Sequence, residues 1–364
     1  MTVRTPKKAK IVVAMSGGID SSVVAALLRK QGYNCVGVYM QFWFDGKSNA
    51  ASAENKCCSR ESMLRAQKIA ARLGMQVCVL DVSKKFKERV VDYFIDSHKK
   101  IITPNPCVMC NKTIKFGALL DFAKSMGADY VATGHYVKVI KKGNKYELHA
   151  GKDKDKDQSY FLYKLDQDQL KHVIFPLGNY TKDQVRRLAQ KLGVKEVKKI
   201  RESQGVCFFP EKDHTPFLKR YLTKRDLKKG PIKTVDGEAI GEHEGLALYT
   251  IGQRKGIGIG GTRDPWYVAG LDAKNNTLIV GKNKDTFTQE MKIKNLSFSS
   301  GGMPQKPIKV KAKIRHRFPV KSAVLEIKKG TGYLRFAQKQ RAITPGQSVV
   351  FYEGSKVLGG GEIV

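Results

Sequence analysis

Short apolar runs alternate with amphipathic stretches along the first 135 residues of the chain. The apolar runs predict strands, and the stretches between them repeat apolar residues at the spacing of one helix face. The predicted strands cover residues 11–15, 34–40, 76–80 and 130–133, and the predicted helices cover residues 20–30, 60–73 and 115–126. A glycine follows each helix, where a C-cap is expected, at Gly32, Gly74 and Gly127. This order predicts a parallel sheet covered by helices on both faces.

The carboxyl ends of the predicted strands carry the candidate site. Ligands of open parallel sheets bind beyond that edge. In this chain the edge carries residues 16–18, Met40, Asp81 and residues 134–135. We expect all of them to border one cleft.

The later part of the chain has a different pattern. A further helix is predicted to begin at Thr181, with Gln184 completing a capping box and Gly193 ending it. Beyond about residue 210, glycines become dense and β-branched residues alternate with polar ones, which predicts two small β-rich modules with a boundary near Asp285.

One predicted strand in this part has a cationic face. Its apolar residues Ile308, Val310, Ala312 and Ile314 alternate with Lys309, Lys311, Lys313, Arg315 and Arg317. A period of two places the five cations on one side. Like charges along one face repel one another, so this strand favours an anionic partner such as RNA over a merely solvated surface.

Composition agrees with such a partner but does not require it. The net charge is +34, from 67 Lys and Arg against 33 Asp and Glu. Such a charge attracts nucleic acid, although a lysine-rich proteome would give the same number. No apolar run is long enough to span a membrane, and the first ten residues lack the apolar segment of a secretory signal, so we expect a cytoplasmic protein.

The strongest local motif is a glycine loop between a predicted strand and a predicted helix. Its residues are Ala14, Met15, Ser16, Gly17, Gly18, Ile19, Asp20 and Ser21. Glycines let backbone N–H groups approach phosphate oxygens, and a helix N-terminus adds partial positive charge. No Gly-Lys-Ser/Thr follows, so this is not a Walker A loop. It resembles the PP-loop of ATP pyrophosphatases, which transfer AMP to an oxygen of the substrate.

The cysteines divide into different groups. Cys35 and Cys78 lie in apolar runs and are interpreted as core residues, and Cys57 and Cys58 as parts of a polar loop. Cys107 and Cys110 form a Cys-x-x-Cys after two prolines, before a predicted helix and near lysines, a setting that favours a reactive thiolate. The same spacing also suits zinc or an iron–sulfur cluster. Cys207 stands alone beside aromatic residues.

Taken together, these motifs resemble the tRNA-specific 2-thiouridylase family. The resemblance extends through further segments, at residues 105–112, 132–136, 156–161, 205–208, 249–256, 344–347 and 358–361. It implies an α/β fold with a doubly wound parallel sheet of PP-loop ATP pyrophosphatase type, followed by two small β-rich domains. The implied domains are a catalytic domain at 1–208, a central domain at 209–284, and a C-terminal tRNA-binding β-barrel at 285–364.

The resemblance also implies residue roles. ATP, with Mg²⁺ near Asp20, would be bound by Ala14, Met15, Ser16, Gly17, Gly18, Ile19, Asp20, Ser21, Met40 and Gly134. The target base would lie beside Asn105, Pro106 and Cys107. The tRNA would be contacted by His135, Lys156, Asp157, Gln158, Arg315, His316 and Gln347.

Two sulfur routes follow from the resemblance. In one, Cys207 carries a persulfide and Cys110 is the nucleophilic or resolving cysteine, with the two thiols forming a disulfide. Many members have Asp at the position of Cys107, so this chain departs from the family pattern by having a third cysteine. In the other route, Cys107, Cys110 and Cys207 therefore bind a [4Fe–4S] cluster with one iron open for sulfide. Zinc is a third, weaker alternative. The implied partners are tRNA and a sulfur-relay protein or cysteine desulfurase, and the implied state is a monomer.

Two other classes of protein remain as rivals. A PP-loop enzyme that adenylates a small molecule would explain the glycine loop but not the cysteine pair or the cationic strand. A non-enzymatic RNA-binding protein would explain the charge but not the glycine loop.

Overall fold

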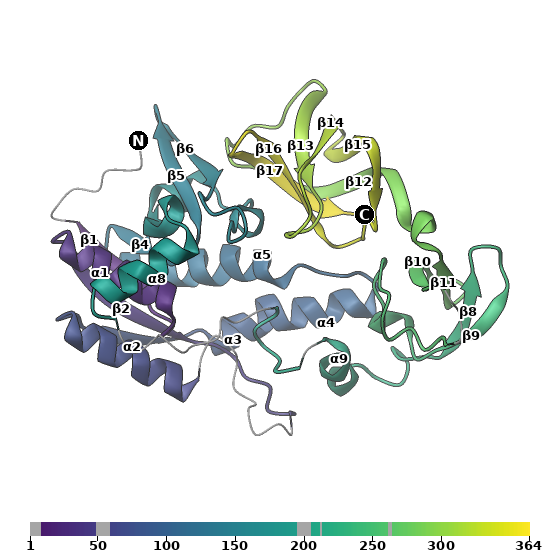
Figure 1. The fold of residues 1–364 in the computed structure, drawn as a ribbon, viewed down its shortest axis with the longest axis horizontal. Helices are drawn as coiled ribbons and strands as arrows, with labels where there is room; N and C mark the ends of the chain where they lie inside the picture. The colour runs from purple at the N-terminus through teal and green to yellow at the C-terminus, as the bar shows by residue number, and fades with distance from the viewer. Residues whose placement is uncertain (1–8, 49–58, 195–204, 212, 261–263) are drawn as a thin grey trace.

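The N-terminal part of the computed structural model is a parallel sheet, and the structure describes residues 9–48, 59–194, 205–211, 213–260 and 264–364 (Figure 1). The strand order is β3-β2-β1-β4-β7, and every pairing is parallel. The strands are β1 (Lys10–Ala14), β2 (Asn34–Gln41), β3 (Val77–Asp81), β4 (Tyr130–Ala132) and β7 (Val173–Ile174). The carboxyl ends therefore lie at one edge, as predicted from the sequence.

Helices cover both faces of this sheet, which confirms the doubly wound fold. On one face, Ile11 and Val13 of β1 join a core with residues of α1 (Ile19–Lys30), α2 (Arg60–Arg72) and α8 (Lys182–Lys191). On the other face, Val12 joins a core with residues of the helices that follow β3 and precede β4. These are α3 (Ser83–Phe86), η1 (Lys87–Val91), α4 (Asp92–Lys99), α5 (Pro106–Cys110), η2 (Asn111–Ala118) and α6 (Leu119–Ser125).

Helix boundaries agree with the sequence pattern at most ends and differ at one start. Gly32, Gly74, Gly127 and Gly193 all have positive φ, which confirms their predicted C-capping role. The last helix before β4 begins at Pro106 and not at residue 115, because proline is well suited to the first helical position. Elements α5, η2 and α6 follow one another without a break.

The central module contains a helix and a small sheet. Helix α9 (Thr215–Tyr221) precedes the strands β8 (Gly230–Thr234), β9 (Ala239–His243), β10 (Tyr267–Asp272) and β11 (Thr277–Gly281). Their order is β10-β11-β8-β9. The short helix η6 (Leu246–Leu248) lies between β9 and β10 in the chain, and η7 (Asn283–Thr286) follows β11.

The C-terminal module is a closed antiparallel barrel. Its strands are β12 (Phe287–Phe298), β13 (Ile308–Lys313), β14 (Lys321–Lys328), β15 (Thr331–Arg341), β16 (Ser348–Glu353) and β17 (Lys356–Ile363). Strand β12 pairs with both β15 and β17, which closes the barrel and leaves neither of these two strands an open edge. The barrel predicted for this part of the chain is confirmed.

A hairpin in the N-terminal part extends toward the barrel. Strands β5 (Val137–Lys142) and β6 (Lys145–Ala150) form the hairpin, and His149 of β6 pairs with Lys356 of β17. The chain then passes through η3 (Ser159–Phe161), α7 (Gln167–Lys171) and η4 (Pro176–Asn179) before α8. Figure 1 shows two long continuous helices, one formed by α3, η1 and α4 and one by α5, η2 and α6, that extend between the parallel sheet and the side of the molecule that carries the barrel and the small sheet.

Candidate active site

The glycine loop connects β1 to α1 in a conformation that requires glycine. Gly17 has φ +71°, and a Cβ there would lie 2.2 Å from the backbone oxygen of Ser62 in α2. The Ser16 backbone N–H donates to Ser21 Oγ at 3.2 Å, and the two serine hydroxyl oxygens are 3.3 Å apart. The Ser21 hydroxyl also lies 3.1 Å from the Gly18 oxygen, to which it donates. Two hydroxyls therefore meet at the N-terminus of α1, which is a suitable cradle for phosphate oxygens.

Asp20 is held by two residues that the sequence did not single out. Lys182 Nζ donates to both carboxylate oxygens of Asp20, at 2.8 and 2.7 Å, and the Tyr136 hydroxyl donates at 2.7 Å. The Lys182 side chain is only 7% exposed. A cation at the first position of a helix opposes the helix dipole, and this is the one local signal that Lys182 needs an acidic partner.

The end of β4 lies against the glycine loop. A Cβ on Gly134 would be 2.9 Å from Asp20 Cβ, so glycine allows this close approach. The structure thus brings Gly134 to the predicted ATP residues. His135 is 8% exposed, and its Nδ1 lies 2.7 Å from Thr133 Oγ1. Burial, with Lys115 nearby, holds the pKa of His135 well below its usual value, so the ring is neutral at pH 7.

The Cys-x-x-Cys lies in the first helical turn after β3 and α4. Pro106 begins α5, Cys107 follows it half-buried, and Cys110 is buried at 7% exposure. Lys112 Nζ donates to Asp166 Oδ2 at 2.5 Å and to Gln169 Oε1 at 2.7 Å. That lysine therefore joins the helix to α7, and its charge is engaged by Asp166.

Cys207 lies on a segment that packs against the continuous helix formed by α3, η1 and α4. Helix α5 packs against the same continuous helix. The Phe208 ring contacts Phe86 and Phe94, with ring centroids 6.0 and 5.4 Å apart. These two phenylalanines flank η1, and α5 packs against η1. Cys207 also packs against the apolar cluster that contains Cys110 and Met40. The distant thiol segments thus share one core, although the roles of the individual cysteines stay predictions.

The three thiols do not form a ligand set for a metal in this arrangement. Within the described ranges, which include Cys107, Cys110 and Cys207, no group of three or more His, Cys, Asp or Glu side chains is placed to hold a metal ion. Cys57 and Cys58 lie outside the described residues.

Several residues predicted to contact tRNA lie where the barrel meets the catalytic part. Gln347 Nε2 donates to the backbone oxygens of Thr103 and Pro104 at 3.1 and 3.0 Å, directly before α5. His316 Nε2 lies 2.8 Å from the Asp157 backbone oxygen. The Arg315 guanidinium instead joins the barrel to the central module, where it donates to the Ile251 backbone oxygen at 3.0 Å.

The other predicted tRNA and base contacts are buried or half-buried in the same region. The Asp157 carboxylate accepts hydrogen bonds from the Gly151 backbone N–H and the Ser159 hydroxyl. Gln158 Oε1 accepts from the Tyr136 backbone N–H. Asn105 is buried, and Lys156 is half-buried. The sequence therefore predicted a set of residues that lie together, and their contacts with RNA stay predictions.

Comparisons with known proteins cover nearly the whole chain. Three family models match in order: a tRNA methyl transferase HUP domain at residues 9–211, a tRNA methyl transferase PRC-barrel domain at 215–282, and an aminomethyltransferase beta-barrel domain at 288–363. The tRNA-specific 2-thiouridylase MnmA 1 of Caldanaerobacter subterraneus subsp. tengcongensis is 46% identical over 357 residues, 97% of each chain. The chain belongs to the tRNA-specific 2-thiouridylase family.

Membership of the 2-thiouridylase family extends over all three modules. The tRNA-specific 2-thiouridylase MnmA of Listeria monocytogenes serovar 1/2a is 43% identical over 358 residues, 97% of this chain and 94% of the relative. Among solved structures, a 4-thiouridine synthetase–RNA complex with bound ATP matches with a TM-score of 0.34 and 18% identity, over 56% of this chain and 46% of that one. Among the described residues, no helix is long and apolar enough to cross a membrane.

Proposed function

We propose that this chain uses ATP to replace the 2-oxygen of the wobble uridine of tRNA with sulfur. The observation that carries the proposal is the placement of the chemical groups. The glycine loop lies at the carboxyl edge of the sheet. The segments of Cys110 and Cys207 both pack on the continuous helix of α3, η1 and α4 that follows β3. The near full-length relatives are named for this activity.

The first step activates the uracil carbonyl, because oxide is a poor leaving group. The 2-oxygen attacks the α-phosphorus of ATP, pyrophosphate leaves, and the base becomes O-adenylated. The predicted phosphate ligands are the N–H groups at the start of α1 and the hydroxyls of Ser16 and Ser21. Lys182 and Tyr136 fix the Asp20 carboxylate beside the loop, so a Mg²⁺ ion bound there would share Asp20 with Lys182.

The second step transfers sulfur. The terminal sulfur of a Cys207 persulfide attacks the activated carbon and AMP leaves, so that Cys207 is joined to the base through a disulfide. The Cys110 thiolate then attacks Cys207 Sγ, forms a Cys110–Cys207 disulfide and releases the thiolated base. A reductant must supply two electrons to reopen this disulfide, and a sulfur-relay protein or cysteine desulfurase must recharge Cys207. Release of hydrosulfide by Cys110 before the attack is the alternative order.

No step is assigned to a [4Fe–4S] cluster, because the three thiols in the structure do not form its ligand set. Anaerobic reconstitution with iron and sulfide tests that choice by absorption spectroscopy. A colourless, fully active protein supports the thiol route, whereas activity that requires a bound cluster contradicts it.

The overall proposal is tested by single-turnover reactions with a tRNA transcript that carries uridine 34. We expect AMP to form only when tRNA is present. Cys207→Ala should abolish 2-thiouridine and leave tRNA binding intact, whereas Cys78→Ala, on the outer strand β3, should retain thiolation. Thiolation by Cys207→Ala would remove that residue from the mechanism. AMP formation without RNA would favour a small-molecule adenylating enzyme.

A further inference from the structure

A charged cluster holds the segment that follows Cys207. The side chain of Asp45 is 0% exposed, and the Arg220 guanidinium donates to its Oδ2 from Nε at 2.9 Å and from a second nitrogen at 2.5 Å. The Tyr221 hydroxyl donates to Asp45 Oδ1 at 2.5 Å. The third guanidinium nitrogen of Arg220 donates to Glu211 Oε1 at 2.5 Å. Arg220 therefore bridges two carboxylates, a task for which its planar fork is well suited.

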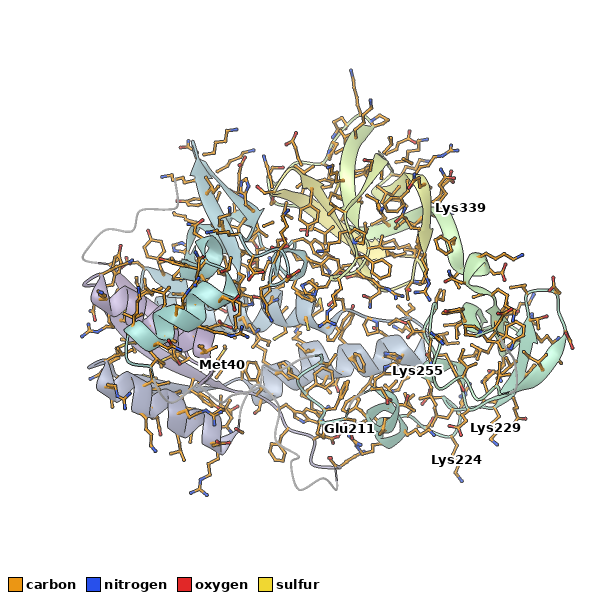
Figure 2. The ribbon with its side chains drawn as sticks, in the orientation of Figure 1. Met40, Glu211, Lys224, Lys229, Lys255 and Lys339 are labelled. Carbon is orange, nitrogen blue, oxygen red and sulfur yellow. The ribbon has the colours of Figure 1, made fainter. Side chains whose placement is uncertain are left out.

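The cluster joins the loop after β2 to two neighbouring segments that lie more than 160 positions later in the chain. Asp45 lies in the loop after β2, Arg220 lies in α9, and Glu211 lies four positions after Cys207. In Figure 2, Glu211 is labelled near α9. Burying the Asp45 carboxylate is costly unless charged donors satisfy it, so this side chain fixes Arg220 in one orientation.

Aromatic rings close the same region. Trp43, two positions before Asp45, contacts the rings of Phe217 and Tyr221 in α9, with centroids 6.5 and 6.2 Å apart. Phe209 stacks on Phe217 with centroids 5.2 Å apart. The Cys207 segment is thus held on one side by its aromatic neighbours and on the other by the Glu211–Arg220 ion pair.

We propose that Arg220, oriented by Asp45, is a positioning residue for the sulfur-transfer step, acting on the Cys207 segment through Glu211. This inference rests on the proposed function. The glycine loop and Lys182 lie outside the cluster, so adenylation does not depend on Arg220. Transfer does, because a misplacement of the reacting sulfur by about 1 Å can slow a reaction on the order of a hundredfold.

The test separates the two half-reactions in the full-length protein. Arg220→Gln and Glu211→Gln should keep tRNA-dependent release of pyrophosphate, the product of adenylation, within about twofold, and should slow formation of 2-thiouridine and the AMP release that accompanies it by at least about tenfold. Arg220→Lys, which retains the charge, should recover part of the lost transfer rate. Lys219→Gln is the matched control, because Lys219 is the exposed neighbour of Arg220 on α9 and pairs with Glu244, outside this cluster.

Glu211→Gln keeps the Asp45–Arg220 pair and so remains informative if Arg220→Gln does not fold. A purely structural role predicts that both half-reactions and the melting temperature fall together, and that result would overturn the proposal, as would unchanged transfer in both variants.

A second measurement does not depend on the proposed reaction. The rate at which iodoacetamide alkylates Cys207, followed by peptide mass spectrometry without tRNA, should rise in Arg220→Gln and Glu211→Gln and not in Lys219→Gln. Unchanged alkylation in both variants contradicts the positioning role. If alkylation changes as expected but the unmodified protein forms no 2-thiouridine, the positioning contact stands and the proposed function fails.

Discussion

At the scale of single residues, Gly17 is required both by backbone conformation and by space. Gly17→Ala and Gly32→Ala each place a Cβ at positive φ, at a strain of about 1–2 kcal/mol. Only at Gly17 does the new carbon meet another atom, the Ser62 oxygen at 2.2 Å, whereas nothing lies within 4 Å at Gly32. We therefore expect Gly17→Ala to lose ATP binding and Gly32→Ala to retain it, by isothermal titration. Equal ATP affinity in the two variants would show that this loop is not the phosphate cradle.

The residues of this loop could be predicted because the signal is local. Ser16, Gly17 and Ser21 stand within six positions, and their arrangement follows from one strand-to-helix turn. Lys182 could not be predicted, because it reaches Asp20 across 162 positions. Asp45 and Arg220 are likewise 175 positions apart. Ion pairs of this kind depend on how elements pack, which a single sequence does not specify.

At the scale of elements, helix α4 contains a buried histidine that makes stability depend on pH. His98 is 2% exposed, its Nδ1 lies 2.9 Å from the Ala247 backbone oxygen, and its ring centroid is 5.0 Å from that of His214. Burial, and then the neighbouring His214, lower the pKa of His98 from 6.5 to about 4. The folded protein therefore holds this ring neutral over most of the pH range in which the unfolded chain protonates it.

The sign of the effect follows from proton uptake. Between pH 6.5 and about 4 the unfolded chain binds more protons than the folded one, so stability falls as the pH falls through this window. The loss should be on the order of 3 kcal/mol in total and should level off below the folded pKa. In urea unfolding at several pH values, His98→Gln should flatten this dependence, and His172→Gln, which lies partly exposed after α7, should not. An unchanged slope in His98→Gln would contradict the assignment.

The same elements show which parts of the fold the sequence carries. Phe86, Val90, Val91 and Phe94 follow helical spacing, so the helical stretch from α3 to α4 was predictable from the pattern, although it was not among the predicted helices. Strand β7 was not predictable, because a strand of two residues has no periodicity. The cationic strand was predicted to continue to Arg317, but β13 ends at Lys313, and Arg315 turns inward to bond the Ile251 backbone.

At the scale of the whole molecule, the barrel is fixed to the catalytic part directly before α5, the helix that carries Cys107 and Cys110. Gly346 approaches residues 102–103 so closely that a Cβ would lie 2.1 Å from a methyl carbon of Ile102. Thr103 donates its backbone N–H to the Pro345 oxygen at 3.0 Å. An RNA held on the barrel would therefore have a defined orientation relative to Cys107 and Cys110.

Positive charge lies on the barrel and on the small sheet as well as on the catalytic part. Figure 2 labels Lys339 on the barrel, and Lys224, Lys229 and Lys255 around the central module. On β13, Lys309 and Lys311 are exposed and Lys313 is half-buried. The outward cations of this strand are thus fewer than the five that the alternation predicted. Replacing these exposed lysines tests whether the positive charge of the chain binds RNA.

Binding of tRNA at different salt concentrations distinguishes a phosphate contact from a general effect of charge. Each lysine that neutralises a phosphate releases counterions, so log K falls as log salt rises. Loss of one such lysine makes this negative slope shallower by about 1. We expect the double variant Lys309→Gln, Lys311→Gln to bind tRNA more weakly and to make that slope shallower by about 2. Lys68→Gln, on the exposed face of α2 far from the barrel in Figure 1, removes a charge without a phosphate contact and should leave the slope unchanged. If the β13 double variant and the α2 variant shift affinity to the same small extent per charge, the high net charge acts as a diffuse property of the chain, and β13 is not part of the RNA interface.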